Sequence, residues 1–510
     1  MEIHVSGRTG LAAQIYRQVR AAVLEGRLRP GEQLPATREL AAQLGISRTT
    51  VGVAYDRLTA EGFLVGRVGA GTYVSDAPLP APPSARGARP GRTVRPRPGW
   101  PTQDSAAPDS AAPDSAAQDS AAQDSAAPDS AAPDSADRAS ADDLPVGGFP
   151  AGSGGAGWDF RVGLPDPGLF PLATWRRLMS GALRAAVFRD DAYGDPAGVP
   201  ALRAAIAHHV GVARAVRADT GDVLVTAGAQ QAFDLIGRVL LAPGDRVAVE
   251  APGYPAVRAL YAARGARIVD VPVDAEGLVV DALPRDVRLV YVTPAHQYPL
   301  GVPLSLPRRA ALLRWADRHD AVVVEDDYDS EFRYADRPLE PLQSLDPDGR
   351  VVYVGSFAKT LSPALRLGFL VAPRSLRPAL VAARRLTDRH GDPVTQHALA
   401  RFLDEGRLAR HVRRATRVYA ERHHALTARL DRDFADVLTR IPSAAGLHLC
   451  ARAAPGVDVE ALARGAARRG VHVETVREHG GMVFGFGLVG AEKIPSGLDA
   501  LRDAVDRSHR

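Results

Sequence analysis

Lysine, cysteine and long apolar runs are all scarce in this chain of 510 residues. Of its 63 basic residues, only Lys359 and Lys493 are lysine. The single cysteine, Cys450, excludes a disulfide framework and a cysteine-cluster metal site. No apolar run approaches the roughly 20 residues that span a bilayer, and residues 1–10 lack a signal-peptide pattern. The sequence therefore predicts a cytoplasmic protein with no membrane partner and no metal site.

Apolar residues make up 45% of the chain and charged residues 24%. A chain of this length and composition is expected to form two or three domains with buried cores. The formal net charge of +4 permits an anionic partner without demanding one.

The composition changes twice along the chain. Residues 76–157 are rich in Pro, Ala, Gly, Ser and Asp, have almost no large apolar side chains, and cannot offset the entropy of folding. Between Asp104 and Asp137 a DSAAP or DSAAQ unit repeats. Before it, five arginines lie between Arg86 and Arg97. We interpret them as a solvated charge run, with a weak nonspecific DNA contact as the alternative. We expect a flexible tether with an r.m.s. span on the order of 50 Å. The predicted parts are a first domain over 1–75, the linker over 76–157, and a second domain over 158–510.

The first 75 residues predict three helices followed by two strands. Apolar residues at four-residue spacing from Leu11 to Val23 predict an amphipathic helix that Gly26 ends. Thr37 and Ser47 are predicted to cap a second helix ending at Leu44 and a third ending near Glu61, with Gly45 left-handed between them. The short segments 63–65 and 72–74 then form a two-stranded wing. This arrangement is a helix-turn-helix with a wing.

Helix periodicity alone fits many small bundles, but the side chains favour a DNA reader. The third helix opens with Ser47, Arg48, Thr49 and Thr50, where a recognition helix contacts base edges. Arg48 suits a guanine edge, and the two threonines suit phosphate or a thymine methyl group. Two further arginines lie near this surface: Arg38, placed for phosphate at the start of the second helix, and Arg67, in the wing.

The segment GRLRPGEQLPATRELAAQLGISRTTVGVAYDRLTAEGFLVGRVGAGTYV resembles the GntR-type winged helix-turn-helix. The resemblance implies a double-stranded DNA operator as partner. Gly52 departs from the larger, often basic residue of some relatives, so the base preference does not transfer. The DNA contacts that the resemblance implies are Arg38, Ser47, Arg48, Thr49, Thr50, Gly69 and Gly71.

From Trp158 onward, short apolar strands alternate with arginine-rich helices. Continuous apolar strands separated by helices predict a parallel sheet covered on both faces, with ligands at the carboxyl ends of its strands. The predicted strands are 222–226, 246–249, 289–293, 321–324 and 351–354.

Polar groups follow three of these strands. The small-residue loop at 227–233 opens a helix and suits a phosphate. The acidic run at 325–329 has three alternative interpretations: a magnesium site, a solvated turn, or a partner for a protonated heterocycle. The run at 355–360 contains Lys359, and Arg366 lies seven residues beyond it.

Lys359 is the informative lysine. A site that needed only positive charge would be expected to carry arginine in this chain, whereas an amine that forms a Schiff base cannot be replaced by arginine. Lys493 lies in a predicted loop and is interpreted as a surface lysine. A lysine, a phosphate cradle and an Asp/Tyr pair together describe a site for pyridoxal 5′-phosphate (PLP).

The second domain resembles the fold-type I aminotransferases. More narrowly, the segments DAYGDPAGVPALRAAIAHHV, TAGAQQAFDLIGRVLLAPGDRVAVEAPGYP, TPAHQYPLG, EDDYDSEFRY and SFAKTLSPALRLGF are similar to the MocR/GabR type of bacterial regulator. The resemblance implies a multidomain protein in which a winged helix-turn-helix, mainly α with a β wing, precedes an α/β fold-type I aminotransferase domain.

The resemblance also implies roles for single residues. Lys359 would form the Schiff base with PLP, Asp326 would pair with the pyridine nitrogen and Tyr328 would bind the ring oxygen. Tyr254 would stack on the ring, and Tyr193 would reach in from a second subunit. The implied phosphate ligands are Ala229, Gln230, Ser356 and Arg366, while His296 and Gln297 stand in the loop that replaces the aminotransferase Asn-Pro-x-Gly segment.

Two departures bear on activity. Ala358 replaces a hydroxyl that is often found before the lysine. Residues 480–487 contain no arginine, although aminotransferases carry a substrate-carboxylate arginine in that region. Other arginines, such as Arg477, are candidate substitutes.

The combined features favour a PLP-dependent transcriptional regulator, expected to be a homodimer that senses PLP, an amine or an amino acid. The alternatives are an active PLP-dependent aminotransferase carrying a DNA-binding domain, and a DNA-binding protein whose aminotransferase fold serves only as a dimerisation scaffold.

Overall fold

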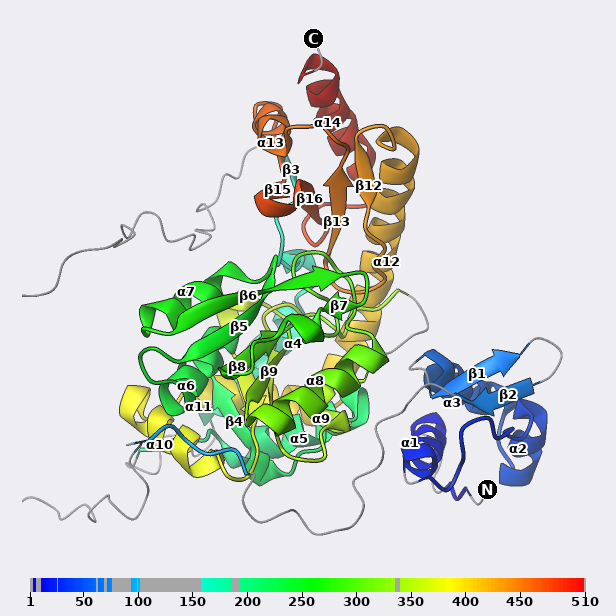
Figure 1. Ribbon diagram of the computed structural model, residues 1–510, viewed down its shortest axis with the longest axis vertical. Helices are drawn as coiled ribbons and strands as arrows, with labels where there is room; N and C mark the ends of the chain where they lie inside the picture. Colours follow the sequence, from blue (N-terminus) through cyan, green and yellow to red (C-terminus); the bar gives the residue numbers. More distant parts are fainter. Residues whose placement is uncertain are drawn as a thin grey trace, which may run out of the picture.

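The computed structural model describes an N-terminal head and a larger body (Figure 1). None of the described helices is long and apolar enough to cross a membrane. The described residues are 3–5, 11–24, 26–60, 63–67, 71–75, 93–98, 100, 157–184, 193–334 and 340–508.

The head has the predicted three helices and two-stranded wing. Tyr55 and Phe63 join the buried apolar face of the first helix, represented by Ile15 and Val19, in one core. The wing strands pair antiparallel, and Gln33 adds a bridge to Tyr73. Its elements are α1 (Leu11–Leu24), α2 (Thr37–Leu44), α3 (Arg48–Ala60), β1 (Leu64–Arg67) and β2 (Gly71–Val74).

The helix ends agree with the sequence except at one cap. Gly45 ends α2 with φ of 64°, as predicted, and the Ser47 hydroxyl accepts a hydrogen bond from the Thr50 amide at 3.1 Å, which caps α3. The prediction that Thr37 caps α2 was wrong. Ala36 is the capping residue and contributes no side-chain bond, because Thr37 already lies in the first turn, where its hydroxyl accepts from Arg48 Nε at 3.4 Å.

An eight-stranded sheet forms the centre of the body. Five adjacent strands, β10, β9, β8, β5 and β6, run parallel. Four of them, all but β6, are predicted strands. The sheet order is β4 (Val223–Thr226), β11 (Gly368–Val371), β10 (Val351–Ser356), β9 (Val322–Asp327), β8 (Val287–Val292), β5 (Arg246–Ala251), β6 (Arg267–Asp274) and β7 (Gly277–Leu278).

The sheet is mixed, which corrects the prediction of a wholly parallel one. β11 runs antiparallel to both β10 and β4, and β7 runs antiparallel to β6. Residues 357–367 connect β10 to β11 with only a short 3₁₀ turn, η6 (Pro363–Leu365). A parallel partner needs a longer crossover, so this short return produces an antiparallel neighbour.

Helices cover both faces of the sheet. Within β9, Val322 and Val324 belong to the apolar cluster with α6, α7 and α10, whereas Val323 belongs to the cluster with α8 and α9. Alternation along a strand explains this division. The helices are α4 (Leu172–Arg184), α5 (Pro200–Arg214), α6 (Ala229–Leu240), α7 (Pro255–Ala263), α8 (Leu306–His319), α9 (Leu342–Leu345), α10 (Arg377–Asp388) and α11 (Pro393–Asp404).

A smaller antiparallel sheet completes the body (Figure 1). Its order is β12 (Leu438–Arg440), β13 (His448–Ala453), β16 (Gly481–Gly485) and β15 (Glu474–Val476). β3 (Trp158–Asp159) pairs parallel with β14 (Val471–His472) and brings residues 160–163 towards the large sheet. The accompanying elements are α12 (Arg407–Asp433), α13 (Val459–Ala467), α14 (Ile494–Ser508), η2 (Pro167–Leu169), η4 (Thr220–Asp222), η5 (Val280–Ala282) and η7 (Arg477–His479).

The head lies against the body beside α8 and α9 (Figure 1). Arg20 of α1 forms an ion pair with Glu340, with 2.8 Å between Nε and Oε2, and donates to the Ser344 carbonyl at 3.0 Å. Both charged side chains are buried by this contact. Most of the predicted linker lies outside the described residues, but 93–98 and Trp100 are described and contact the body.

Candidate cofactor site and nucleic-acid interface

The carboxyl edge of the large sheet gathers the predicted cofactor residues. Asp326 lies near the end of β9 and pairs in register with Val354 of β10. Lys359 follows the end of β10 by three residues. The turn before α6 follows β4, which reaches the same edge through β11. Residues that are far apart in the sequence therefore surround one location.

The Lys359 amine is held against a glycine. Its Nζ donates to the Gly163 carbonyl at 2.5 Å. Burial lowers the pKa of Lys359, although the carboxylates of Asp329, Asp326 and Glu474 oppose that shift. A Cβ at Gly163 would lie 2.7 Å from Nζ, and its φ is +79°, so this position favours glycine on both counts.

Asp326 offers an unpaired buried acceptor. Its Oδ2 accepts from the Tyr291 hydroxyl at 2.6 Å, whereas Oδ1 is buried without a hydrogen-bond partner. Burial raises the pKa of Asp326 to about 7, and the Tyr291 bond opposes this rise. A buried acceptor without a donor is costly. This carboxyl therefore fits a group that brings a buried N–H, such as a protonated pyridine nitrogen.

The turn before α6 forms a cradle. Gly228 has φ of +84° and precedes the helix without any side-chain cap, so the first amides of α6 remain available. Arg366 donates to the Ala227 carbonyl at 2.7 Å. A Cβ at Gly228 would lie 3.1 Å from the Arg366 guanidinium. The glycine thus keeps open the space where helix amides and an arginine converge, which is the environment an anion prefers.

The other predicted phosphate ligands lie around this cradle. Ala229 is half-buried and Gln230 is exposed at the start of α6. The Ser356 hydroxyl accepts from the Ala358 amide at 3.1 Å. Ala358 thus contributes its backbone to the turn before Lys359, although it lacks the hydroxyl of many relatives.

Tyr328 lies in a buried polar cluster. Its hydroxyl donates to the His296 carbonyl at 2.8 Å and lies 3.2 Å from His296 Nδ1. Asp329 accepts from the same Nδ1, with both carboxylate oxygens at 3.1 Å. The His448 ring is 4.5 Å from the His296 ring, and Nε2 of each histidine is buried without a partner.

One ligand atom from each of His296, Asp329 and His448 lies within 4.8 Å of the other two. Such donors can bind a metal. However, Asp329 already accepts from His296 and from the Leu447 amide at 3.1 Å. These contacts form a network that orients His296 behind Tyr328.

Tyr254 and Gln297 belong to the neighbouring wall. The Tyr254 ring makes an edge contact with Tyr298 at 5.6 Å. Gln297 donates to the Pro252 carbonyl at 2.8 Å and approaches Glu250 at 3.4 Å. Burial raises the pKa of Glu250 to about 7, against hydrogen bonds from Thr293 and Gln297. These hydrogen bonds tie the loop that contains Gln297 to the end of β5.

The acidic run at 325–329 is not a solvated turn. Glu325 accepts from the amides of Leu342 and Gln343, and Asp327 pairs with Arg214 at 2.9 Å. All four carboxylates of the run are buried, and they have different partners. Among them, Asp326 combines a raised pKa with an oxygen that lacks a partner.

The region of the missing carboxylate arginine is apolar. Val483 of β16 is buried in a cluster with Val162 and Cys450. Arg477 does not substitute, because its side chain is 81% exposed and lies 3.5 Å from Glu460. The group that does approach Lys359 here is Glu474, whose Oε1 accepts from the Val162 amide at 2.8 Å, one residue before Gly163.

Two predicted residues lie apart from this site in the single chain. Tyr193 is 73% exposed, and its ring contacts His390 and the Arg389 guanidinium. Lys493 is exposed in the turn before α14, as the sequence predicted.

The predicted DNA-contact residues share one end of α2 and α3. Arg38, Ser47, Arg48 and Thr49 are exposed, and Thr50 is half-buried. Gly71 opens β2 with φ of +113°. Arg67 ends β1, but its side chain lies outside the described part of the chain, as does the whole of Gly69.

Sequence reasoning missed several residues of the cofactor site. Tyr291 lies inside a strand that reads as a continuous apolar run, so nothing marked its hydroxyl as a partner of Asp326. Glu474 and His448 come from the small sheet, which the sequence did not resolve. Gly163 carried one available signal, the Gly-Leu-Pro-Asp-Pro turn immediately after a predicted domain boundary.

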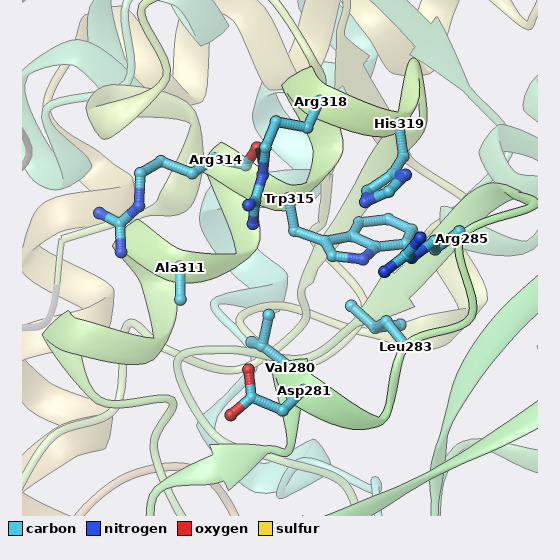
Figure 2. Close-up of a pocket in the computed structure, with 9 residues that line it drawn as sticks. All are labelled: Val280, Asp281, Leu283, Arg285, Ala311, Arg314, Trp315, Arg318 and His319. Carbon is cyan, nitrogen blue, oxygen red and sulfur yellow. Dashed lines mark hydrogen bonds between the residues drawn. The ribbon is translucent and has the colours of Figure 1, made fainter.

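A separate hollow lies between η5 and α8 (Figure 2). Its volume is about 350 Å³, and Trp315 lines it with the His319 ring tilted against the indole, 4.9 Å between ring centroids. None of the predicted cofactor residues lines it, so it is distinct from the Lys359 site. The lining residues are Val280, Asp281, Leu283, Arg285, Ala311, Arg314, Trp315, Arg318 and His319.

Two known families match separate parts of the chain. Residues 11–74 match the bacterial regulatory proteins of the gntR family. Residues 176–480 match the aminotransferase class I and II family. The second match covers more than half of the chain.

Full-length relatives combine both parts. The probable rhizopine catabolism regulatory protein MocR of Rhizobium meliloti is 35% identical over 501 residues, covering 96% of this chain and 93% of its own. The pyridoxine biosynthesis transcriptional regulator PdxR of Corynebacterium glutamicum is 31% identical over 505 residues, covering 98% and 96%.

Solved aminotransferases share the fold of the body. Kynurenine aminotransferase of Pyrococcus horikoshii has a TM-score of 0.65 at 28% identity, covering 70% of this chain and 92% of its own. The α-aminoadipate aminotransferase LysN of Thermus thermophilus has a TM-score of 0.63 at 31% identity, covering 69% and 92%.

A gntR-family head followed by a fold-type I aminotransferase body, in the same order and over nearly the same length as in these relatives, shows that the chain belongs to the MocR-type transcriptional regulators within the aminotransferase class I and II family.

Proposed function

We propose that this protein is a PLP-dependent transcriptional regulator that binds an operator with its head and senses PLP, or an amine, with its body. The observation that carries this proposal is the convergence of Lys359, the unpartnered Asp326 Oδ1 and the Arg366 cradle in a chain that also has a gntR-family head. The family matches at 11–74 and 176–480 support domain boundaries at 1–75 and 158–510, with the linker between them.

The residues of the body fit PLP. Lys359 would hold its aldehyde carbon and Asp326 its ring nitrogen. Tyr328 lies where a hydroxyl can reach the ring oxygen, and the half-buried Tyr254 ring can stack on the pyridine. The phosphate ligands would be the amides of Ala229 and Gln230, the Ser356 hydroxyl and the Arg366 guanidinium.

When bound, PLP supplies an electrophilic carbon that joins to an amine and a ring that withdraws electrons from it. The chain contributes the control of protons. Burial lowers the pKa of Lys359 and so favours the neutral amine that can attack. Ionised Asp326 would hold a proton on the ring nitrogen, and Asp329 orients His296 behind Tyr328.

The head would read DNA through the exposed end of α3. Arg48 suits a base edge, while Arg38 and the Ser47, Thr49 and Thr50 group suit phosphate or a thymine methyl group. Arg67, Gly69 and Gly71 would carry the wing contact. Loss of Arg48 is expected to relax base preference, whereas loss of Arg38 should weaken all sequences similarly.

DNA binding to the region upstream of its own or neighbouring genes tests the sensor. Binding is measured with and without PLP, at fixed salt, for the natural protein and for Lys359→Ala. We expect PLP to change the affinity of the natural protein and to leave that of the variant unchanged. Equal binding in all four samples would remove the sensor role and leave only a DNA-binding scaffold.

The effector that best suits this pocket is an amine without a carboxylate beside its amino group. Amino-acid substrates, which carry that carboxylate, need an arginine fork to bind it. Here β16 presents Val483 in an apolar cluster, and Arg161, near the lysine, is bonded to Asp159 at 2.8 Å. Glu474 lies beside the residue that accepts from Lys359 and favours a hydroxyl or a cationic group.

Matched pairs of compounds test this preference. Cadaverine and lysine differ only by a carboxylate, as do ethanolamine and serine. We expect amines to shift the visible absorbance of the PLP-loaded protein at lower concentration than their amino-acid partners. Glu474→Gln should weaken the diamine more than ethanolamine. A consistent preference for the amino acids would contradict the amine class while leaving PLP sensing intact.

A homodimer is supported by large apolar side chains that the single chain leaves exposed. Leu172 and Leu183 of α4 and Leu386 of α10 are each more than half exposed, as is Tyr193. A partner subunit would bury such side chains. Light scattering gives the molar mass of the natural protein and of the variants Leu183→Glu and Leu386→Glu. A monomeric natural protein would contradict the homodimer and the contribution of Tyr193 from a partner.

Transamination is the second candidate, favoured by the complete cofactor cradle and opposed by the apolar β16. Repeated turnover of an amino donor with an oxoacid would establish it.

A further inference from the structure

A short part of the predicted linker is docked on the body. The Arg97 amide donates to the Val239 carbonyl at 2.8 Å, and Arg97 Nε donates to the Arg238 carbonyl at 3.0 Å. Both acceptors lie in the last turn of α6. Arg288 reaches from β8 to donate to the Arg95 carbonyl at 2.6 Å. The segment therefore makes backbone contacts with two separate elements of the body.

Apolar burial accompanies these hydrogen bonds. Val94 is 1% exposed within the cluster that contains α6 and the large sheet, and Trp100 packs against the same cluster. The Arg97 guanidinium lies 5.7 Å from the Trp100 ring, and the Trp100 amide donates to the Arg97 carbonyl at 3.2 Å. Burial of one valine and partial burial of one tryptophan distinguish this segment from the Pro/Ala/Ser/Asp-rich sequence around it.

The docking position is remote from the cofactor. The carboxyl ends of the parallel strands carry Lys359 and Asp326, whereas Arg288 lies at the beginning of β8. The docked segment appears as a short blue stretch at the lower left of the body in Figure 1. Neither family match includes it, since they cover 11–74 and 176–480.

We propose that residues 93–98 and Trp100 form an anchor of the linker, so that only residues 76–92 tether the head and the DSAAP/DSAAQ repeat lies outside that tether. The 17 residues from 76 to 92 reach at most about 60 Å, whereas the 82 residues from 76 to 157 would reach about 280 Å. The length of the repeat then does not set the reach of the head.

Hydrogen exchange on the full-length, PLP-loaded protein tests the anchor. We expect the Arg97 amide to exchange at least about tenfold more slowly than in a synthetic peptide of residues 90–102, because it is bonded to Val239. Val94→Asp should remove this protection. Thr93→Asp, which adds the same charge at an exposed neighbour, should retain it. Exchange of the natural protein at the peptide's rate would overturn the proposal.

Insertions of equal length test the tether. Twenty Gly/Ser residues are inserted after Ser84 or after Ser120 in a chain carrying Arg20→Glu, which breaks the head's ion pair with Glu340. Spin labels at Gln43→Cys and Ser375→Cys, in a Cys450→Ala background and diluted with unlabelled chain, report the distance from head to body.

We expect the insertion after Ser84 to broaden the distance distribution and the insertion after Ser120 to leave it unchanged. Equal broadening by both insertions, or no broadening after Ser84, would overturn the proposed tether.

Discussion

Lys359 shows how a residue's surroundings decide its chemistry. The two lysines of the chain have the same side chain but different surroundings. Lys493 is exposed in a turn, whereas Lys359 donates a hydrogen bond to the Gly163 carbonyl and lies near three carboxylates. Burial favours its neutral form, and the carboxylates limit that effect. The result is a buried amine with a lowered pKa and carboxylates close by.

Asp326 should impose a pH dependence on the cofactor-free protein. Its carboxyl has a pKa of about 7 when folded and an ordinary value of 3.8. Between about pH 4 and 7 the unfolded chain loses this proton while the folded chain keeps it, so stability falls as pH rises through this window. Below pH 4 both states are protonated, and above pH 7 the loss is complete.

The measurement is urea unfolding of Asp326→Asn and the natural protein from pH 4 to 8. We expect the variant to gain stability relative to the natural chain as pH rises, at up to about 1.4 kcal/mol per pH unit. Asp503→Asn, at an exposed carboxyl, is the control. A constant difference across this range would contradict the raised pKa.

Gly163→Ala should displace the Lys359 amine. The added Cβ would lie 2.7 Å from Nζ, and a φ of +79° costs an alanine about 1–2 kcal/mol. Gly480→Ala provides the matched control, because Gly480 has φ of +53° and no atom within 4 Å of an added Cβ.

Both variants should lose stability, but only Gly163→Ala should also lower the affinity for PLP, measured by titration of the visible absorbance. Equal PLP affinity in the two variants would show that the contact with Gly163 does not position Lys359.

At the level of elements, one side-chain hydroxyl caps the first turn of α3. Ser47 Oγ accepts from the Thr50 amide and lies 2.8 Å from the Thr50 hydroxyl. The neighbouring helix α2 has no such side-chain cap, since Ala36 precedes it. In the head, a side-chain cap therefore stabilises the first turn of α3 but not that of α2.

Ser47→Ala should lower the stability of the head by about 1 kcal/mol, because it removes the cap of α3. Thr49→Ala, in the same first turn of α3 but outside the capping hydrogen bond, should have a smaller effect. Hydrogen exchange of the Thr50 amide measures the difference. Unchanged exchange in Ser47→Ala would show that the hydroxyl serves DNA contact alone.

At the level of the whole molecule, the ion pair between Arg20 and Glu340 connects the two parts. Its side chains are 9% and 2% exposed, so removing one partner leaves the other buried and uncompensated. Glu340→Gln should therefore release the head more than the exposed-site change Glu492→Gln. Small-angle scattering should show a larger radius of gyration for Glu340→Gln, and an unchanged radius would contradict docking through this pair.

Much of the fold followed from local patterns. Four-residue spacing and turn residues defined α1, α2 and α3 to within a few residues, and apolar runs located five strands of the large sheet. Thr37 was misplaced as a cap because helix boundaries one residue apart look alike in sequence. β11 was missed because a short return strand has no helix before it to mark a parallel crossover.

The sequence by itself determined that the chain has a reading head, an aminotransferase-like body and one lysine whose chemistry arginine cannot supply, because propensity, periodicity and side-chain chemistry are local. Only the tertiary structure decided which groups meet. It placed the Tyr291 hydroxyl on Asp326, Glu474 near Lys359, and Val94 against the body. These contacts join residues far apart along the chain, and burial, which sets their pKa and their cost when unpaired, exists only once the elements have packed.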